Sequence, residues 1–563
     1  MKPYLIYTAL IALLYTATAK AQPHTLNAPK LVVGIVIDQM RWDNLYRYNA
    51  KYGSTGFNKL LKQGYSCNNT FIPYTPTVTA AGHTCIYTGS VPAYHGMVGN
   101  AWYSKQLKRN IYCTEDSTVT SVGSTTKNGA MSPANMLTTT ITDQLKLATN
   151  QVSKTVGIAI KDRGAILPAG HTADAAYWYD SKTGNWITSS HYTQALPAWV
   201  TTFNNRKMVD SLYALNWNTI NPILTYTNSN GDEHAYEGKL LGEKTSSFPH
   251  NLQQYIGKNY DQLPNTPQGN TFTLAMAMAA IDNMQLGRNS VTDFLAISLS
   301  SPDYVGHKYG PNSIEIEDTY IRLDKELGNL LVYLDQTIGM GKYTVFLTAD
   351  HGVAHIPGYL QELKIPAGSW DNDAMVKDIN TMLKARYGVA NIVLGETNYQ
   401  LYLNDSAIQA NTLDRVQLVR IIVQYCEQQK GIAQAFDLHQ LTTTTLAEPL
   451  RTMLINGYHK KRSGDVQIIL EPAYIDGGKV GTTHGLWNPY DSHIPMLWYG
   501  AGIATGYTNA TMYMTDIAPT LAALLHIEIP NACVGKVMDG VLLYTMQAPL
   551  PSTTIKNQKS IKK

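Results

Sequence analysis

Six acidic and imidazole side chains lie in four short fragments of the sequence, three of which follow short apolar runs. They are Asp38, Asp303, His307, Asp350, His351 and His484. Three carboxylates and three imidazoles are enough ligands for two zinc ions that keep positions open for a substrate. Each residue alone is a weak signal, because a single Asp after a strand is more often a helix cap or a turn residue. Together they favour a metal centre.

A hydroxyl beside such a centre could act as a nucleophile. Thr79 lies in the segment PYTPTVTAAGH, where the small residues that follow it predict a loop entering a helix. A helix N-terminus favours phosphate, because its N–H groups and its dipole face the anion. Without the metal fragments, Thr79 would be interpreted as a helix cap, a role that Thr75 and Thr77 could also take.

Buried strands must position these residues. The runs Leu31–Ile37, Phe294–Leu299 and Tyr343–Leu347 are continuous and apolar, as is typical of parallel strands covered on both faces. Helical spacing follows a predicted cap at Ser313, and another helix is predicted from Thr515. The sequence therefore predicts an α/β fold with a central, mostly parallel sheet flanked by helices. Ligands bind at the carboxyl ends of such strands, so the acidic residues should converge.

Two stretches look like inserted subdomains of this core. The stretch at about 161–272 is rich in Trp, Tyr, Asn and Thr and has few long apolar runs. The stretch at about 357–474 has a helical pattern of its own, from Val416 to Tyr425. We expect residues 22–563 to form a single catalytic domain that carries both insertions.

The N-terminus has the sequence pattern of a secretory signal peptide. One basic residue precedes an apolar run, and a small-x-small ending at Ala19–Ala21 predicts cleavage after residue 21. The run is too short and too often interrupted to span a bilayer. We expect a periplasmic or secreted protein without a membrane span, and a monomer.

The net charge of the chain is only +3, and 15% of its residues are charged. Such a charge produces no electrostatic field strong enough to imply a nucleic acid partner.

Five cysteines form an odd and sparse set without any C-x-x-C pair. They are Cys67, Cys85, Cys113, Cys426 and Cys533. An oxidising compartment would permit one or two disulfides, which we expect among the first three cysteines. A chain of this length does not need them, because it can bury a large core unaided.

The motifs together resemble the alkaline phosphatase superfamily over residues of about 31–530, and within it the PafA-type, phosphate-irrepressible bacterial alkaline phosphatases. The matching residues, in chain order, are Asp38, Thr79, Asn100, Lys161, Arg163, Asp303, His307, Asp350, His351 and His484. The resemblance implies two Zn²⁺ per chain. One would be bound by Asp303, His307 and His484. The other would be bound by Asp38, Thr79, Asp350 and His351.

The resemblance also implies a role for three residues that carry no metal. Asn100, Lys161 and Arg163 would bind phosphoryl oxygens and assist catalysis. Since a monoester carries two negative charges and a diester one, extra cations favour the monoester. On their own, Lys161 and Arg163 could be solvated loop cations.

The implied function is a zinc-dependent alkaline phosphatase that hydrolyses small phosphate monoesters with broad specificity in phosphate scavenging. Thr79 would be the nucleophile, and a phospho-threonine the intermediate. A phosphodiesterase or nucleotide pyrophosphatase of the same superfamily is the first alternative, because it shares the metal ligands and the threonine. A secreted zinc-binding protein without turnover is the second. A sulfatase is disfavoured, because the signature of that family, C-x-P-x-R, does not occur in this sequence.

Overall fold

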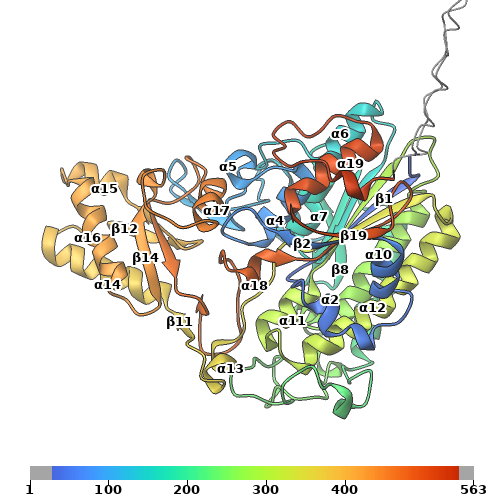
Figure 1. Ribbon diagram of the computed structural model, residues 1–563, viewed down its shortest axis with the longest axis horizontal. Coiled ribbons are helices and arrows are strands. Elements are labelled where there is room, and N and C mark those ends of the chain that lie inside the picture. Colours follow the sequence, from blue (N-terminus) through green and yellow to red (C-terminus); the bar gives the residue numbers. More distant parts are fainter. Residues whose placement is uncertain (1–27, 544–563) are drawn as a thin grey trace, which may run out of the picture.

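The computed structural model describes residues 28–543, which form a large core and a smaller lobe beside it (Figure 1). The predicted signal peptide at residues 1–21 lies outside the described residues. Between residues 28 and 543, no helix is both long and apolar enough to cross a membrane.

An 11-stranded sheet runs through the core. Its strands are β1 (Leu31–Ile37), β2 (Tyr65–Phe71), β5 (Ser121–Val122), β6 (Thr155–Ala159), β7 (Ala175–Asp180), β8 (Asn185–Ser189), β9 (Asp293–Leu299), β10 (Tyr343–Thr348), β17 (His493–Ile494), β18 (Met496–Gly500) and β19 (Gly506–Tyr513). The five central strands, in the order β10-β1-β9-β6-β7, are parallel. Antiparallel strands extend the sheet at both sides, through β18 and β8. The predicted α/β fold is confirmed, and its parallel part is the centre of the sheet.

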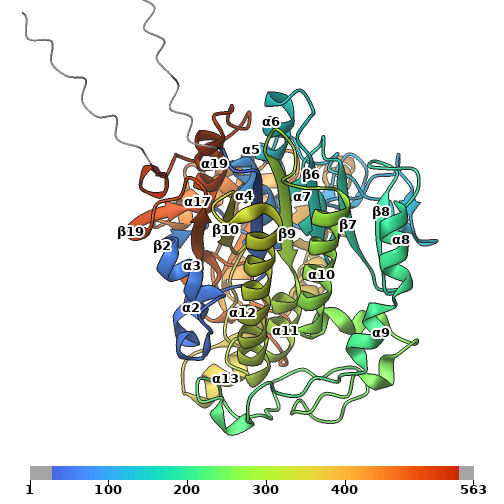
Figure 2. The same cartoon turned by 90° about the vertical axis from the view of Figure 1, so that its right-hand side faces the viewer.

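Helices cover both faces of this sheet (Figure 2). Those of the core are α2 (Asn44–Arg47), α3 (Phe57–Gln63), α4 (Thr79–Thr88), α5 (Pro92–His95), α6 (Ile141–Ala148), α7 (Asp162–Ala169), α8 (Ala198–Asn205), α9 (Met208–Tyr213), α10 (Gln268–Asn283), α11 (Ser301–Tyr309), α12 (Ile314–Leu334), α13 (Pro357–Glu362), α18 (Pro489–Ser492) and α19 (Ile517–Leu525). Ser313 caps α12, since its hydroxyl accepts the Ile316 N–H at 3.2 Å, as the sequence predicts.

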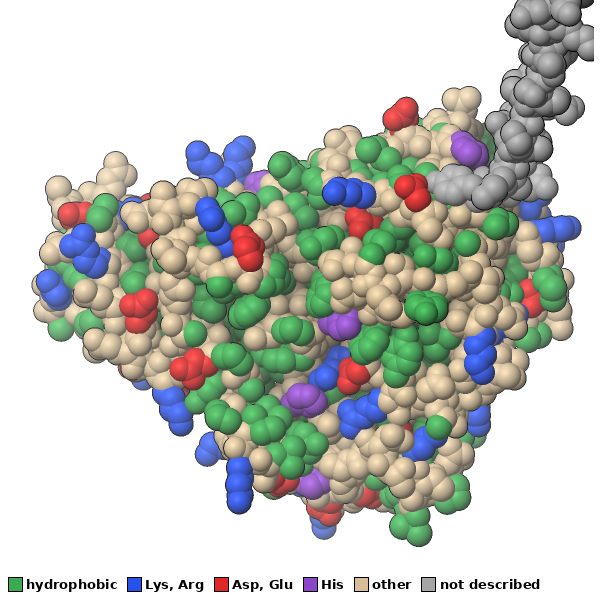
Figure 3. Space-filling model, in the orientation of Figure 1, with side chains coloured by type: hydrophobic (Ala, Val, Ile, Leu, Met, Phe, Trp, Pro, Cys, Tyr) green, Lys and Arg blue, Asp and Glu red, His purple; other side chains and the backbone are tan. Residues whose placement is uncertain are grey.

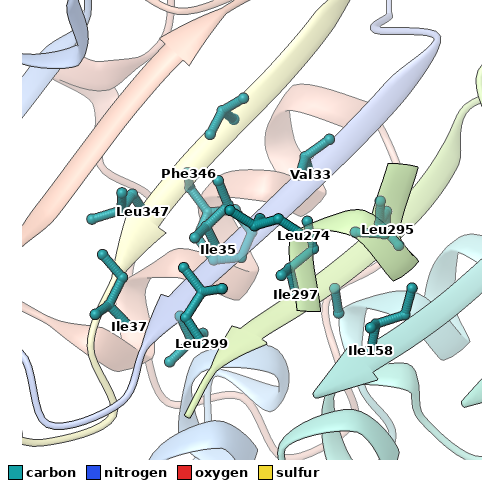
Figure 4. Packing of buried hydrophobic residues seen from close by; sticks show 14 of the residues in the cluster. Val33, Ile35, Ile37, Ile158, Leu274, Leu295, Ile297, Leu299, Phe346 and Leu347 are labelled. Atoms are coloured by element: carbon teal, nitrogen blue, oxygen red, sulfur yellow. The ribbon is translucent and has the colours of Figure 1, made fainter. Parts of the chain in front are cut away.

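The central strands are buried along their whole length. All seven residues of β1 and all seven of β9 are buried. Figure 4 shows Ile35, Leu274, Ile297 and Phe346 packed together around these strands. Such burial on both faces explains why the sequence of these strands is a continuous apolar run rather than an alternating one.

The smaller lobe has a sheet and a hydrophobic cluster of its own. Its four-stranded sheet has the order β12-β13-β15-β14. The elements are α14 (Asn372–Tyr387), β12 (Val393–Thr397), β13 (Gln400–Leu403), α15 (Asp405–Ala410), α16 (Arg415–Glu427), β14 (Ile432–Asp437), α17 (Leu450–Gly457) and β15 (Val466–Leu470). They fall within the second predicted insertion, 357–474. Strands β7 and β8, in the first predicted insertion, pair within the main sheet. The division into one catalytic domain with two insertions stays a prediction.

All five cysteines are free thiols. The disulfide expected among Cys67, Cys85 and Cys113 is therefore wrong. These three side chains are buried in different surroundings: Cys67 lies on β2, Cys85 lies on α4 with its sulfur 3.2 Å from His95 Nε2, and Cys113 follows the β3–β4 hairpin (Ala101–Ser104 and Arg109–Tyr112).

Truncation of a central strand residue should lower stability strongly. Ile297→Ala leaves a cavity in β9, where the side chain is 1% exposed, so we expect a loss of about 2–5 kcal/mol in the free energy of unfolding. Denaturant unfolding followed by circular dichroism measures this loss. Val416→Ala, at a residue that is 55% exposed on α16, is the control and should change stability by less than about 0.5 kcal/mol. Equal effects of the two changes would contradict the assigned core.

Candidate metal centre and phosphoryl site

The predicted site residues meet at one edge of the main sheet. Asp38 follows β1, Asp350 and His351 follow β10, and Asp303 and His307 lie on α11, which follows β9. His484 lies on the loop before α18. The carboxyl ends of neighbouring parallel strands point to the same edge, and this explains how residues that are distant in sequence converge.

Two groups of ligand atoms lie close enough to hold metal ions. One group is Asp38, Asp350 and His351, and the other is Asp303, His351 and His484. His351 belongs to both, because its ring stacks on that of His484 with centroids 3.5 Å apart. His307 lies beside the second group, with Nε2 at 3.2 Å from Asp303 Oδ1.

The spacing of these atoms fits tetrahedral coordination. His351 Nε2 lies 3.5 Å from Asp38 Oδ1 and 3.5 Å from Asp350 Oδ2, and His484 Nε2 lies 3.5 Å from Asp303 Oδ1. Two ligands on one zinc, with bonds of about 2.0–2.1 Å and tetrahedral angles, are separated by about 3.3–3.4 Å. The distances therefore leave room for an ion between the ligands.

The imidazoles are oriented as metal ligands. Each donates its Nδ1–H to a backbone carbonyl, which leaves the Nε2 lone pair for the centre. The acceptors are the carbonyl oxygens of Thr482 for His307, Gly352 for His351 and Thr77 for His484, at distances of 2.8, 3.0 and 2.8 Å. Burial, and then the charges of His351 and His307, lower the pKa of His484 well below its usual range, so this ring is neutral.

The carboxylates need a cation. Burial, and then the charges of Asp303 and Asp350, raise the pKa of Asp38 well above its ordinary value. Among the described residues, the buried oxygen Asp38 Oδ1 has no hydrogen-bond partner. A buried carboxylate oxygen without a partner is costly, and a divalent cation would offset this cost. The donor set thus fits the two metals that the sequence predicts.

Thr79 lies beside both groups at the N-terminus of α4. Its Oγ1 is 3.5 Å from His351 Nε2 and 3.4 Å from Lys161 Nζ. The ammonium of Lys161 also contacts Asp38 Oδ2 at 2.6 Å and Asp303 Oδ2 at 2.5 Å. Burial opposes the charge on Lys161, but these two carboxylates raise the pKa of Lys161 above its usual value. The lysine therefore bridges a carboxylate of each group and faces the hydroxyl.

Asn100 contacts the same helix end, and Arg163 lies in a cavity beside Lys161. Asn100 Oδ1 accepts the Ala80 N–H at 2.9 Å, which leaves the amide nitrogen as a donor next to Thr79. Arg163 lies in the first turn of α7 and donates from Nη1 to Tyr112 Oη at 3.0 Å. Lys161, Arg163 and Tyr112 line a common cavity of about 270 Å³. In the described part of the chain, the buried Arg163 Nε–H has no hydrogen-bond partner.

The structure adds two supporting residues. Gln39, with φ of 67°, donates from Nε2 to Asp303 Oδ1 at 2.7 Å and from its backbone N–H to Asp350 Oδ1 at 3.2 Å. His83 contacts Thr79 O at 2.9 Å and Asp350 Oδ2 at 3.3 Å through Nδ1. No local pattern marks Gln39, because its contacts come from strands far away in sequence. His83, one helical turn after Thr79, fits the i, i+4 spacing of a helix.

A larger apolar cavity lies away from this centre. It has a volume of about 820 Å³, is lined by Met453, Trp487 and Met512 among others, and contains none of the predicted site residues. Figure 3 shows that hydrophobic side chains gather between the lobe and the core, while charged side chains are scattered over that face. The residues that can do chemistry are at the strand ends, and we place the functional site there.

Comparisons with known proteins show the family of the chain. Residues 32–491 match the family model of type I phosphodiesterase / nucleotide pyrophosphatase. Alkaline phosphatase PhoV of Synechococcus elongatus is 48% identical over 94% of this chain and 98% of its own length. Alkaline phosphatase PafA of Elizabethkingia meningoseptica is 48% identical over 91% and 94%, respectively. A protein of Myroides odoratus named calcium-transporting ATPase is 51% identical over 91% and 94%.

Solved structures show the same fold. The crystal structure of wild-type alkaline phosphatase PafA covers 92% of this chain and 99% of its own, with a TM-score of 0.90 and 47% identity. A variant of that enzyme with a threonine, an asparagine, a lysine and an arginine replaced has also been solved, and it matches equally well. The chain therefore belongs to the type I phosphodiesterase / nucleotide pyrophosphatase family and, within it, to the PafA and PhoV alkaline phosphatases.

Proposed function

We propose that this protein is a zinc-dependent alkaline phosphatase that hydrolyses small phosphate monoesters through a phospho-threonine at Thr79. The observation that carries the proposal is the position of the Thr79 hydroxyl at a helix N-terminus, within 3.5 Å of both His351 Nε2 and Lys161 Nζ. The names of the PhoV and PafA relatives support the same activity. The four residue types replaced in the solved PafA variant are those that this proposal uses.

Two zinc ions would be held by the side chains described above, one by Asp303, His307 and His484 and the other by Asp38, Thr79, Asp350 and His351. When bound, such a pair supplies charge stabilisation for the attacking and leaving oxygens of an in-line displacement. The Thr79 oxygen attacks phosphorus, the bond to the ester oxygen breaks, and hydrolysis of the phospho-threonine then regenerates the hydroxyl. The dipole of α4 favours the negative charge of the phosphoryl group at the helix N-terminus.

Three further side chains hold the phosphoryl oxygens in this mechanism. Lys161 acts as a point charge, Arg163 as a planar donor and Asn100 as a neutral donor. Because charge on the non-bridging oxygens is held by preorganised groups, little reorganisation is needed when the phosphoryl group transfers. The same groups favour the doubly charged monoester over the singly charged diester.

The wider biological role is proposed from the sequence. With cleavage of residues 1–21, the protein would be periplasmic or secreted and would release phosphate from small esters as a monomer. No nucleic acid partner is proposed, since the net charge of +3 is small for a chain of 563 residues.

Removal of the nucleophile should abolish turnover. We expect Thr79→Ala to lower kcat/KM for p-nitrophenyl phosphate on the order of a thousandfold or more, because no other hydroxyl replaces the attacking group. Thr79→Ser keeps a hydroxyl and is the matched control. Acid quenching with radiolabelled substrate should trap label on the wild type and on Thr79→Ser but not on Thr79→Ala. Full activity of Thr79→Ala would refute the covalent route.

Metal binding should stabilise the fold through His351. Zinc added to the metal-free protein should raise the midpoint of thermal unfolding, since saturation at a hundred times Kd stabilises by about 2.7 kcal/mol. His351→Ala should remove most of this increase, because the ring belongs to both ligand groups. His439→Ala, an exposed histidine of the lobe, is the control and should respond as the wild type does. A zinc response that survives in His351→Ala would contradict the assigned ligands.

The choice between monoester and diester tests the second candidate, a phosphodiesterase, an activity that the description of the family model names. Arg163→Ala removes a charged donor, which should lower kcat/KM for p-nitrophenyl phosphate about 10- to 150-fold. Hydrolysis of bis-p-nitrophenyl phosphate should fall much less. Arg163→Lys restores the charge without the planar geometry and should recover only part of the loss. Equal losses for both substrates would reject the role of Arg163.

A further inference from the structure

A strained turn of the smaller lobe reaches the active site. The loop between β12 and β13 consists of Asn398 and Tyr399 alone, with φ angles of 60° and 62°. Two residues with positive φ form the type I′ turn that such hairpins favour, and its second position is usually Gly. A tyrosine there is uncommon, since a bulky side chain is disfavoured at positive φ. Strain of this kind is a reason to ask what the side chains of the turn contact.

The two side chains of the turn contact two segments of the site. Asn398 donates from Nδ2 to Ala101 O at 2.9 Å, and Ala101 is the residue after Asn100. A Cβ atom on Gly99 would lie only 2.2 Å from Asn398 Nδ2, so the amide packs directly against the backbone there. Tyr399 donates its hydroxyl to His484 O at 3.4 Å. The turn thus joins the segment of Asn100 to that of His484.

The lobe holds this turn rigidly. The Tyr399 side chain is 8% exposed and belongs to the hydrophobic cluster of the lobe, where it stacks on Trp370 with ring centroids 6.1 Å apart. Its carbonyl oxygen accepts the Ile468 N–H at 2.9 Å and Gln467 Nε2 at 3.0 Å. The tip of the hairpin is therefore fixed by β15, and the burial of the ring offsets the strain of the backbone.

The contact between Asn398 and Ala101 lies where it can determine the orientation of Asn100. The carbonyl oxygen of Asn100 accepts the Cys113 N–H at 3.0 Å, and its side chain accepts the Ala80 N–H at 2.9 Å. These bonds fix one side of Asn100, toward α4 and the β3–β4 hairpin. From the side of the lobe, Asn398 fixes the carbonyl group of Ala101, the residue that follows Asn100.

We propose that Asn398 is a positioning residue for the phosphoryl site: the lobe, through the Asn398–Tyr399 turn, holds the carbonyl group of Ala101 and thereby the backbone at Asn100, so that the Asn100 amide faces the phosphoryl group. This inference rests on the proposed function, in which Asn100 binds a phosphoryl oxygen. Asn398 itself touches no substrate atom and acts through the backbone of Ala101. The smaller lobe is then a part of the catalytic framework.

The test removes the amide and keeps the turn. Asn398→Gly retains a residue that adopts positive φ freely and deletes the donor to Ala101. We expect kcat/KM for p-nitrophenyl phosphate to fall about five- to tenfold, and the inhibition constant of inorganic phosphate to rise by a similar factor. The matched control is Asn391→Gly, at an exposed residue of the same lobe with φ of 55°, and it should leave both constants unchanged. Thermal unfolding checks that both variants fold.

Asn398→Asp is the second variant, in case the glycine disturbs the hairpin. It conserves size and tolerates positive φ, but it replaces the donor with a carboxylate oxygen that repels Ala101 O. We expect a loss at least as large as that of Asn398→Gly, with Asn391→Asp as its control.

A double-substitution cycle separates positioning from general stability. In an Asn100→Ala background, Asn398→Gly should cause no further loss, because the residue that it positions is gone. The inference is overturned if Asn398→Gly and Asn398→Asp match their controls, or if their losses persist in full in that background. If Asn100→Ala alone leaves kcat/KM and the inhibition constant of phosphate unchanged, it is the proposed role of Asn100 that fails.

Discussion

The structure depends on the burial of three carboxylates at one edge of the main sheet. Asp38, Asp303 and Asp350 are each no more than 3% exposed, and an uncompensated charge in such a place is costly. The Lys161 ammonium compensates two of them, and burial lowers the pKa of His351 and His484, whose Nε2 atoms face the centre. The three carboxylates and the one ammonium together carry an excess of negative charge, and this excess suits divalent cations. The same ions that relieve the repulsion would then be the source of the chemistry, so stability and activity share one interaction.

Around this centre, the fold supplies orientation more than additional chemistry. Gln39 reaches one carboxylate on α11 and another after β10, and His83 ties α4 to the strand end that carries Asp350. The fit between α4 and that strand end is close, because a Cβ atom on Gly82 would lie 2.4 Å from the Asp350 carbonyl oxygen. The lobe adds its own support through the turn at Asn398. An enzyme that must hold a hydroxyl and several donors within a fraction of an ångström needs such a framework.

Much of this could be predicted from the sequence. Continuous apolar runs marked the central strands, Ser313 marked the start of α12, and strand-end positions brought the metal-ligand candidates together. Other features could not be predicted, because they depend on contacts between distant segments. The positive φ of Gln39 has no local signature, and the place of His351 between two ligand groups follows from its stacking on His484. The lobe was visible as a stretch of separate character, but its approach to Asn100 was not.

The five free thiols bear on how the protein can be made and handled. The described fold contains no cystine, so no disulfide crosslinks its core. Cys67, Cys85, Cys113 and Cys426 are enclosed in the native state, and burial raises the pKa of each thiol, so thiolate chemistry is suppressed as long as the chain is folded. Alkylation of these four thiols therefore reports on unfolding of the protein, whereas Cys533 is partly exposed in the folded chain.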